Sequence, residues 1–248
     1  MPSLFALFLV LAAGPFVERA VKAGDTERPY RVYAPDDLKP DEKLPIVLFL
    51  HGAGERGRDG LEPTRVGFGP ELVKRSGSVR AIAVIPQIGG RREYWIDANL
   101  EYALAALAAA EKEFHADPDR VYLTGLSMGG YGAWTLASLH PERFAAIAIV
   151  CGGIRAPWDR SEPTGDPYKE TAEKVQKLPV RLYHGNFDRT VPVAESRKMH
   201  ELLKGLGADV TYVELEGVGH NSWDKAYGDD ELWKWLFAQK RGAPTTKQ

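Results

Sequence analysis

The chain has 248 residues, of which 44% are hydrophobic and 27% are charged, with 25 glycines and 17 prolines. This composition excludes collagen-like, coiled-coil and disordered proteins, and the length allows one large α/β domain that needs no disulfide or metal to stabilise it. The 32 basic and 34 acidic residues give a formal net charge of −2. With no long run of like charges, this balance argues against binding to nucleic acid or to anionic lipid.

The N-terminal segment contains an uninterrupted apolar run from Leu4 to Ala13. The run is shorter than the ~20 residues of a membrane-spanning helix, so no stable membrane span is predicted, but it fits the apolar region of an export signal. No Lys or Arg precedes the run, and Ala13 and Ala23 are the candidate cleavage sites. We therefore expect residues 1–23 to hold either a signal peptide of an exported protein, periplasmic or secreted, or an apolar arm of a cytoplasmic one.

From Pro29 onward, short β-rich apolar runs alternate with longer helical patterns, which is typical of a mostly parallel, twisted sheet with helices on both faces. The predicted strands are Tyr30–Tyr33, Ile46–Leu50, Ala81–Ile85, Val121–Thr124, Ala145–Val150, Val180–Tyr183 and Val210–Glu214. The predicted helices are Ala98–Phe114, Met128–Leu139, Val193–Leu206 and Asp230–Gln239. A continuous apolar run such as Ile46–Leu50 indicates a central strand that is buried on both faces.

No repeat and no Pro-rich or Gly/Ser-rich linker divides the chain, so we expect residues 16–248 to form a single α/β domain. Two long segments without periodicity, Gly52–Pro70 and Gly152–Pro167, each follow a predicted strand. Ligands bind at the carboxyl ends of strands in open α/β sheets, so these segments are predicted to form walls of a site. Only residues 151 to 178 separate two of the predicted strands, which leaves no room there for a large lid domain.

Residues 125–129 read GLSMG and match the pattern G-x-S-x-G between a predicted strand and a predicted helix. In a sharp strand-to-helix turn, side chains two residues from the central serine would collide with the backbone, so glycine is required on both sides. The positive end of the following helix favours an anion that develops there. The pattern therefore predicts Ser127 as a nucleophile.

A serine hydroxyl needs a base to take its proton and a carboxylate to orient that base, in the chain order Ser, acid, His. Asp188 lies just beyond the strand ending at Tyr183, and His220 lies in a Gly-rich loop after the last predicted strand. Both offsets are long enough for a crossover between neighbouring parallel strands. We therefore predict a catalytic triad of Ser127, Asp188 and His220.

Other residues offer similar chemistry in less favourable positions. His184 is the alternative base, but at the start of the acid loop its side chain is expected to pack rather than to react, and His51 is expected to form structural hydrogen bonds. Asp159 and Asp166 in the second long segment are the alternative acids. Cys151 is the only cysteine and lies in an apolar stretch, so we expect a buried inert thiol and predict no metal site.

An oxyanion hole needs two backbone N–H groups, one from the residue after the nucleophile and one from a loop after an earlier strand. Met128 supplies the first. The small residues of HGAGERG at 51–57 let the backbone approach a substrate, so Ala53 is the predicted second donor, with Gly54 as the alternative. The loop lacks the lysine-containing pattern of a phosphate-binding loop.

Four motifs in this order resemble the α/β-hydrolase superfamily: LHGAGERG at 50–57, GLSMGG at 125–130, HGNFD with VP at 184–192, and GHNSW at 219–223. Within it, the chain is similar to small secreted esterases grouped with phospholipase/carboxylesterase-like and polyhydroxybutyrate-depolymerase-like proteins. The resemblance covers nearly everything from Phe16 to Lys240. It implies an α/β-hydrolase fold and an acyl-enzyme mechanism.

These observations predict a serine carboxylesterase that hydrolyses short-chain acyl or aryl esters, small or polymer-linked, without a cofactor. Trp95, Trp158 and Trp223 lie near strand ends or catalytic loops and are candidates for substrate contact. The alternatives are a serine peptidase of the prolyl-oligopeptidase-like type, a feruloyl or polyester esterase, and a non-catalytic binding module of the same fold. Nothing in the sequence indicates an oligomeric state.

Overall fold

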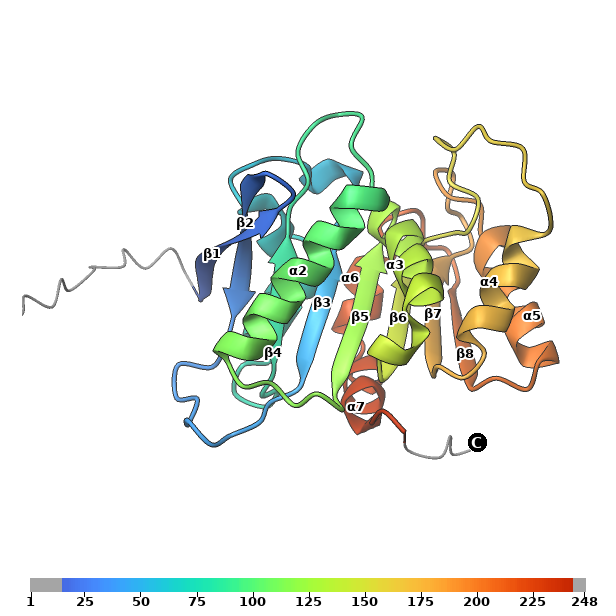
Figure 1. Cartoon of the computed structure of the whole chain (residues 1–248). Helices are drawn as coiled ribbons and strands as arrows, with labels where there is room; N and C mark the ends of the chain where they lie inside the picture. Colours follow the sequence, from blue (N-terminus) through green and yellow to red (C-terminus); the bar gives the residue numbers. More distant parts are fainter. Residues whose placement is uncertain (1–14, 243–248) are drawn as a thin grey trace, which may run out of the picture.

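One mixed sheet organises the protein, whose computed structural model describes residues 15–242 (Figure 1). The strands are β1 (Phe16–Ala23), β2 (Thr26–Tyr33), β3 (Ile46–Leu50), β4 (Ile82–Pro86), β5 (Val121–Leu126), β6 (Ala146–Val150), β7 (Val180–Gly185) and β8 (Val210–Leu215). Their order is β1-β2-β4-β3-β5-β6-β7-β8. The β1–β2 and β2–β4 pairs are antiparallel and the other pairs are parallel, which confirms the mostly parallel sheet.

Helices cover both faces of the sheet, as predicted (Figure 1). They are α1 (Phe68–Lys74), α2 (Asp97–Glu113), α3 (Met128–Leu139), α4 (Pro167–Val175), α5 (Ala194–Gly205), α6 (Trp223–Gly228) and α7 (Asp230–Ala238). Helices α2 to α5 pack on one face, and α1, α6 and α7 pack on the other. Along β3, Leu48 and Leu50 point to the first layer while Val47 and Phe49 point to the second, because successive side chains of a strand alternate.

Strand β1 was not among the predicted strands. Its sequence, FVERAVKA, has only one fully buried residue, Phe16, because the strand lies at the edge of the sheet. Such an edge strand lacks the continuous apolar run by which the central strands were recognised. The predicted leader lies largely in residues 1–14, outside the described residues. Cleavage after Ala23 would remove β1, whereas cleavage after Ala13 would leave the sheet intact.

Short helices also lie within segments that the sequence predicts as irregular. The first long segment contains two single 3₁₀ turns, Ala53–Glu55 and Glu62–Thr64, and ends in α1. Between β6 and β7 there is only a loop and the short helix α4, so no large domain is inserted there. Within residues 15–242, none of the helices combines the length and the apolar character needed to cross a bilayer.

Candidate active site

Ser127 occupies the sharp turn between β5 and α3. Its φ of +52° and ψ of −119° lie outside the regions favoured by ordinary residues, and its N–H donates to the Val150 carbonyl at 2.9 Å. A Cβ atom on Gly125 would lie 2.3 Å from the Gly129 carbonyl oxygen, and one on Gly129 would lie 1.9 Å from that of Leu50. The two glycines therefore let strand, turn and helix pack closely enough to hold the serine in this strained conformation.

A continuous hydrogen-bonded chain joins the three residues that the sequence selects. The Nε2 atom of His220 lies 2.9 Å from the Ser127 Oγ, and its Nδ1 lies 2.7 Å from an oxygen of Asp188. Because an ionised carboxylate can only accept, Nδ1 carries a hydrogen and Nε2 of the neutral ring is free to accept from the hydroxyl. The side chain of Asp188 is fully buried and that of His220 is 23% exposed. The hydrogen-bonded chain therefore leads from the interior to a partly exposed serine.

Asp188 is held as a charged carboxylate. Its Oδ1 accepts from the N–H groups of Thr190 at 2.8 Å and Val191 at 2.9 Å, while Oδ2 faces His220. Burial on its own would raise the pKa of Asp188, but the hydrogen bonds from His220 and from these two N–H groups outweigh it, so the pKa lies below its ordinary value. The carboxylate therefore stays ionised at neutral pH.

His184, expected to pack at the start of the acid loop, also contacts the carboxylate. Its Nε2 lies 3.2 Å from Asp188 Oδ2 and 3.1 Å from the Val191 carbonyl, and its Nδ1 lies 2.8 Å from the Ser196 hydroxyl. The carbonyl can only accept, so the hydrogen is on Nε2. Burial lowers the pKa of His184 by more than the hydrogen bond to Val191 and the charge of Asp188 raise it, so the ring is neutral. The position of His184 four residues before Asp188 is the only sequence signal for this contact.

The loop after β3 is fixed by a buried histidine. His51 donates from Nδ1 to the Gly52 carbonyl at 2.6 Å and accepts at Nε2 from the Ile88 N–H at 3.1 Å. Burial lowers the pKa of His51 to about 4, so the ring is neutral and can perform both roles. The indole of Trp95 donates to the His51 carbonyl at 2.9 Å. This confirms a structural role for His51.

Two backbone N–H groups close to Ser127 in the fold have no protein acceptor in the described part of the chain. Ala53 begins the 3₁₀ turn after β3, and Met128 is the first residue of α3. First-turn N–H groups have no partner within their own helix, so they are available to a bound oxygen.

Glu55 ends the 3₁₀ turn that begins at Ala53, and it was not predicted as a site residue. Its Oε2 is buried and has no hydrogen-bond partner in the described part of the chain. A Cβ on Gly52 would lie 2.9 Å from this atom, so glycine at position 52 leaves room for the carboxyl. Burial raises the pKa of Glu55, and the neighbouring backbone of Gly52 and of Glu55 itself partly opposes that rise.

The three tryptophans proposed for substrate contact have different surroundings. Trp95 is only 1% exposed and belongs to the core beneath the loop, so the prediction that it contacts substrate is wrong. Trp223 lies against His220 with ring centres 5.4 Å apart, edge to face. Trp158 is partly buried and stacks on Tyr94 at 4.3 Å between ring centres. Trp158 therefore lines a groove, whereas Trp223 packs between the base and the core.

Cys151 follows β6 directly and lies close to the same residues. It is buried, as expected, and its sulfur, together with Asp188 and His220, offers potential metal ligand atoms within 4.8 Å of one another. Burial raises the pKa of the thiol to about 12. Because a metal binds the thiolate rather than the thiol, this protonated sulfur is a poor ligand.

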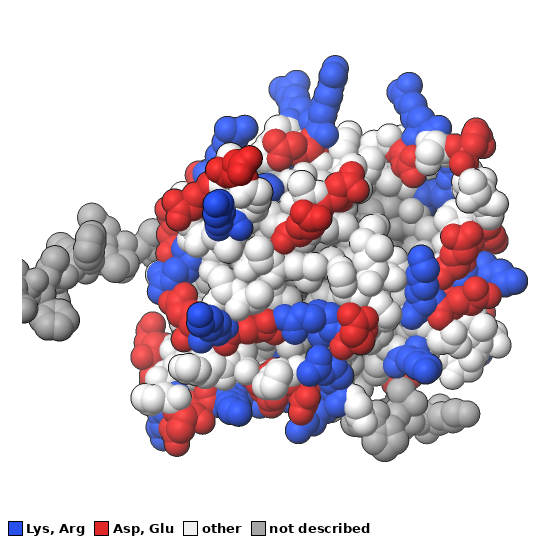
Figure 2. Space-filling view, in the orientation of Figure 1, with Lys and Arg blue, Asp and Glu red and all other residues white. Residues whose placement is uncertain are grey.

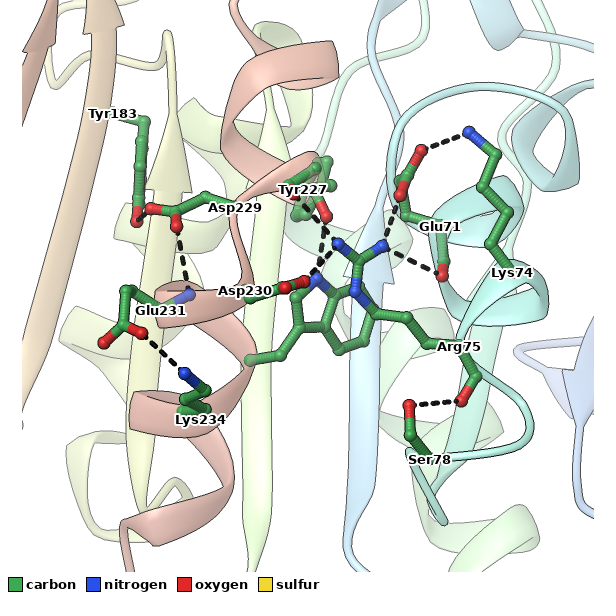
Figure 3. Close-up of polar contacts among 12 residues, drawn as sticks. Glu71, Lys74, Arg75, Ser78, Tyr183, Tyr227, Asp229, Asp230, Glu231 and Lys234 are labelled. Atoms are coloured by element: carbon green, nitrogen blue, oxygen red, sulfur yellow. Dashed lines mark hydrogen bonds and ion pairs between the residues drawn. The ribbon is translucent and has the colours of Figure 1, made fainter.

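The segment after His220, which contains α6 and α7, is anchored to the end of α1 and to β7 (Figure 3). Arg75 at the end of α1 donates to the Gly228 carbonyl at 2.9 Å and to Asp230 at 2.8 Å. The Tyr183 hydroxyl, in the strand that leads to the acid, donates to Asp229 at 2.7 Å. These contacts tie the elements that carry the acid and the base to one another.

The sequence and the fold both match known esterases. The profile of the family described as "Putative esterase" matches residues 22–239. "Putative esterase NocK" of Nocardia uniformis subsp. tsuyamanensis is 33% identical over 69% of this chain and 48% of its own length, so the chain spans about half of that relative. Carboxylesterase SOBER1 of Arabidopsis thaliana is 27% identical over 81% of this chain and 93% of its own length.

A solved structure titled as that of a thermostable esterase superposes with a TM-score of 0.77 at 32% identity, over 92% of this chain and 64% of that one. The family profile begins near the end of β1 and ends at the residue after α7, so it covers strands β2 to β8 and every residue of the hydrogen-bonded triad. The chain therefore belongs to this esterase family and has the α/β-hydrolase fold.

Proposed function

We propose that the protein is a serine carboxylesterase in which Ser127 is the nucleophile, His220 the general base and Asp188 the residue that orients the base. The observation that carries this proposal is the hydrogen-bonded chain, with 2.9 Å from Ser127 to His220 and 2.7 Å from His220 to Asp188. The first distance is short enough for the hydroxyl proton to pass to the imidazole as the oxygen attacks, and the second lets Asp188 hold the ring in the orientation that this transfer needs.

The reaction follows from this geometry in two halves. Ser127 Oγ attacks the ester carbonyl while His220 Nε2 takes the hydroxyl proton, and the imidazolium then gives this proton to the departing alcohol. The N–H groups of Ala53 and Met128 stabilise the oxyanion of the tetrahedral intermediate. Water then attacks the acyl-enzyme with His220 again acting as the base, which releases the acid and restores the serine.

Short-chain acyl and aryl esters are the proposed substrates. No large domain is inserted between β6 and β7, which leaves the site open to small soluble molecules. A panel of 4-nitrophenyl acetate, butyrate and palmitate, together with peptide 4-nitroanilides, tests this choice. We expect the acetate and butyrate to be hydrolysed with the highest kcat/KM. Preferential cleavage of the anilides would instead favour the peptidase alternative.

A proline at position 53 tests the proposed oxyanion donor. Ala53 is the first residue of a 3₁₀ turn and Gly52 before it is extended, with φ −77° and ψ −178°, so proline fits the local backbone and removes only the N–H. We expect Ala53→Pro to lower kcat for 4-nitrophenyl acetate by roughly 10²- to 10³-fold, with little change in the thermal midpoint. An unchanged kcat in a folded variant would exclude this N–H, and the same substitution at Gly54 would then test the alternative donor.

His184 is proposed to position Asp188 rather than to react. In His184→Phe the carboxylate loses a donor, so it holds the His220 proton more tightly and the acid limb of kcat/KM against pH moves to higher pH. Loss of one hydrogen bond to a charged group is expected to lower kcat by about tenfold. His184→Gln keeps a donor and should restore most of the activity, which a general packing defect in His184→Phe would not predict. A pH profile identical to that of the wild type in His184→Phe would contradict this role.

A further inference from the structure

A groove of about 470 Å³ lies between the loop that joins β4 to α2 and the loop that joins β6 to α4. It is lined by Arg92, Tyr94, Pro157, Trp158 and Arg160. The rings of Tyr94 and Trp158 stack with their planes 12° apart, and the Arg56 guanidinium lies 4.9 Å from the centre of the Tyr94 ring. The two loops therefore hold each other in place, and the groove has an aromatic wall.

The groove is linked to the proposed nucleophile through Tyr131, which lies one turn of α3 after Ser127. Trp158 packs edge to face on Tyr131 with ring centres 5.1 Å apart, and the Tyr131 N–H donates to the Ser127 carbonyl at 3.2 Å. On the other side, Arg56 contacts the sulfur of Met128 at 2.8 Å. Both walls of the groove are thus linked to the first turn of α3, which follows Ser127 directly, and an ester bound at Ser127 is expected to extend one of its ends toward the groove.

The charged groups that line the groove are both basic. Arg92 and Arg160 are exposed, and neither has a hydrogen-bond or ion-pair partner within residues 15–242. The neighbouring acids are engaged elsewhere, since Asp159 accepts from Ser161 and Glu93 accepts from the backbone. Figure 2 shows Lys and Arg side chains projecting from the top edge of the molecule, where these two loops lie in Figure 1.

We propose that this groove binds a ring that carries a carboxylate, with the ring against the Tyr94–Trp158 pair and the carboxylate at Arg92 and Arg160. Guanidinium groups bind carboxylates through paired hydrogen bonds, and aromatic side chains pack against flat rings. The preferred substrates are then esters that carry, on an aromatic or sugar ring, a separate carboxylate that is not part of the ester bond. This inference rests on the proposed serine esterase function.

Binding to the Ser127→Ala variant tests the groove without catalysis. Isothermal titration compares benzoate with benzamide, and D-glucuronate with D-glucose, so that each pair differs in the negative charge and the two pairs separate an aromatic from a sugar source. In one of the two pairs, we expect the anion to bind at least fivefold more tightly than its neutral partner, and that pair identifies the kind of ring. In the double variant Arg92→Gln/Arg160→Gln this preference should be lost, and high salt should weaken it. The exposed Arg91, which does not line the groove, gives the matched control Arg91→Gln, which should keep the preference.

Kinetics then show which end of the ester enters the groove. The pair 4-acetoxybenzoate and 4-acetoxybenzamide places the ring on the alcohol side, and the pair monomethyl terephthalate and methyl 4-carbamoylbenzoate places it on the acid side. We expect kcat/KM to favour the anion about five- to tenfold in one pair, through KM, and the double arginine variant to abolish that preference. Equal kcat/KM within both pairs, with equal binding of anion and neutral partner, would overturn the groove while hydrolysis of the neutral esters still supports the esterase. Anion binding without hydrolysis of any ester would instead overturn the proposed function and leave the groove.

Discussion

Ser127→Ala is expected to lower kcat for 4-nitrophenyl acetate by roughly 10⁴- to 10⁶-fold, because it removes the only atom in the hydrogen-bonded chain that can form the acyl-enzyme. The fold should be unaffected, since the substitution removes one oxygen at an accessible turn. Matching far-UV circular dichroism and thermal midpoints would show this. Ser138→Ala, on the same helix α3 and far along it, is the matched control and should keep wild-type kcat.

The three hydrogen-bonded residues Ser127, Asp188 and His220 are expected to act as a unit. Single substitutions of Ser127 or His220 by alanine should each cost about as much as the double substitution, because the nucleophile is useless without its base. If Ser127→Ala retained activity within tenfold of the wild type, Ser127 would not be the nucleophile. Multiplicative losses in the double variant would contradict the coupling between the two residues.

Gly129→Ala is expected to have the largest effect on stability. Its Cβ would lie 1.9 Å from the Leu50 carbonyl oxygen and 2.7 Å from that of His51, and both atoms belong to backbone that cannot rotate away. Helix α3 would have to move off β3, so we expect a loss of ~3 kcal/mol or more in the free energy of unfolding. The displaced turn would carry Ser127 out of reach of His220, so kcat should fall as well.

Chemical denaturation of Gly129→Ala beside Gly205→Ala measures this effect. Gly205 ends helix α5, and nothing lies within 4 Å of a Cβ at that position. Alanine there should be neutral or stabilise by about 0.5–1 kcal/mol, because it restricts the unfolded chain and favours the helix. A Gly129→Ala variant with the denaturation midpoint and kcat of the wild type would show that α3 and β3 do not need this close approach.

The parts of the fold that the sequence could predict are those set by local pattern. Continuous apolar runs such as Ile46–Leu50 identify central strands, because only a strand buried on both faces needs them. Strand β1 could not be recognised in the same way, since half of its pattern is solvated and its pairing with β2 decides its structure. The short helices α1 and α6 are likewise stabilised by their contacts with each other and with the sheet rather than by their own sequences.

Within the site, the order and spacing of Ser127, Asp188 and His220 could be predicted because each follows a strand in the parallel part of the sheet. The surroundings of a side chain depend on tertiary packing, which sequence spacing does not specify. For this reason the sequence predicts substrate contact for Trp95, although its side chain is buried in the core. For the same reason it does not predict the contact of His184 with the Asp188 carboxylate. The stacking of Tyr94 on Trp158 joins two loops more than sixty residues apart in the chain, and no local pattern indicates it.

Covalent labelling determines whether Ser127 is an activated nucleophile. The protein is treated with a fluorophosphonate, digested and mapped by mass spectrometry, with residual hydrolysis of 4-nitrophenyl acetate followed in the same sample. We predict one phosphonyl group per chain, on Ser127, formed in step with the loss of activity and absent from both Ser127→Ala and His220→Ala. Full activity after treatment with no adduct on the protein, or an inactivating adduct on a residue other than Ser127, would show that Ser127 is not the activated nucleophile.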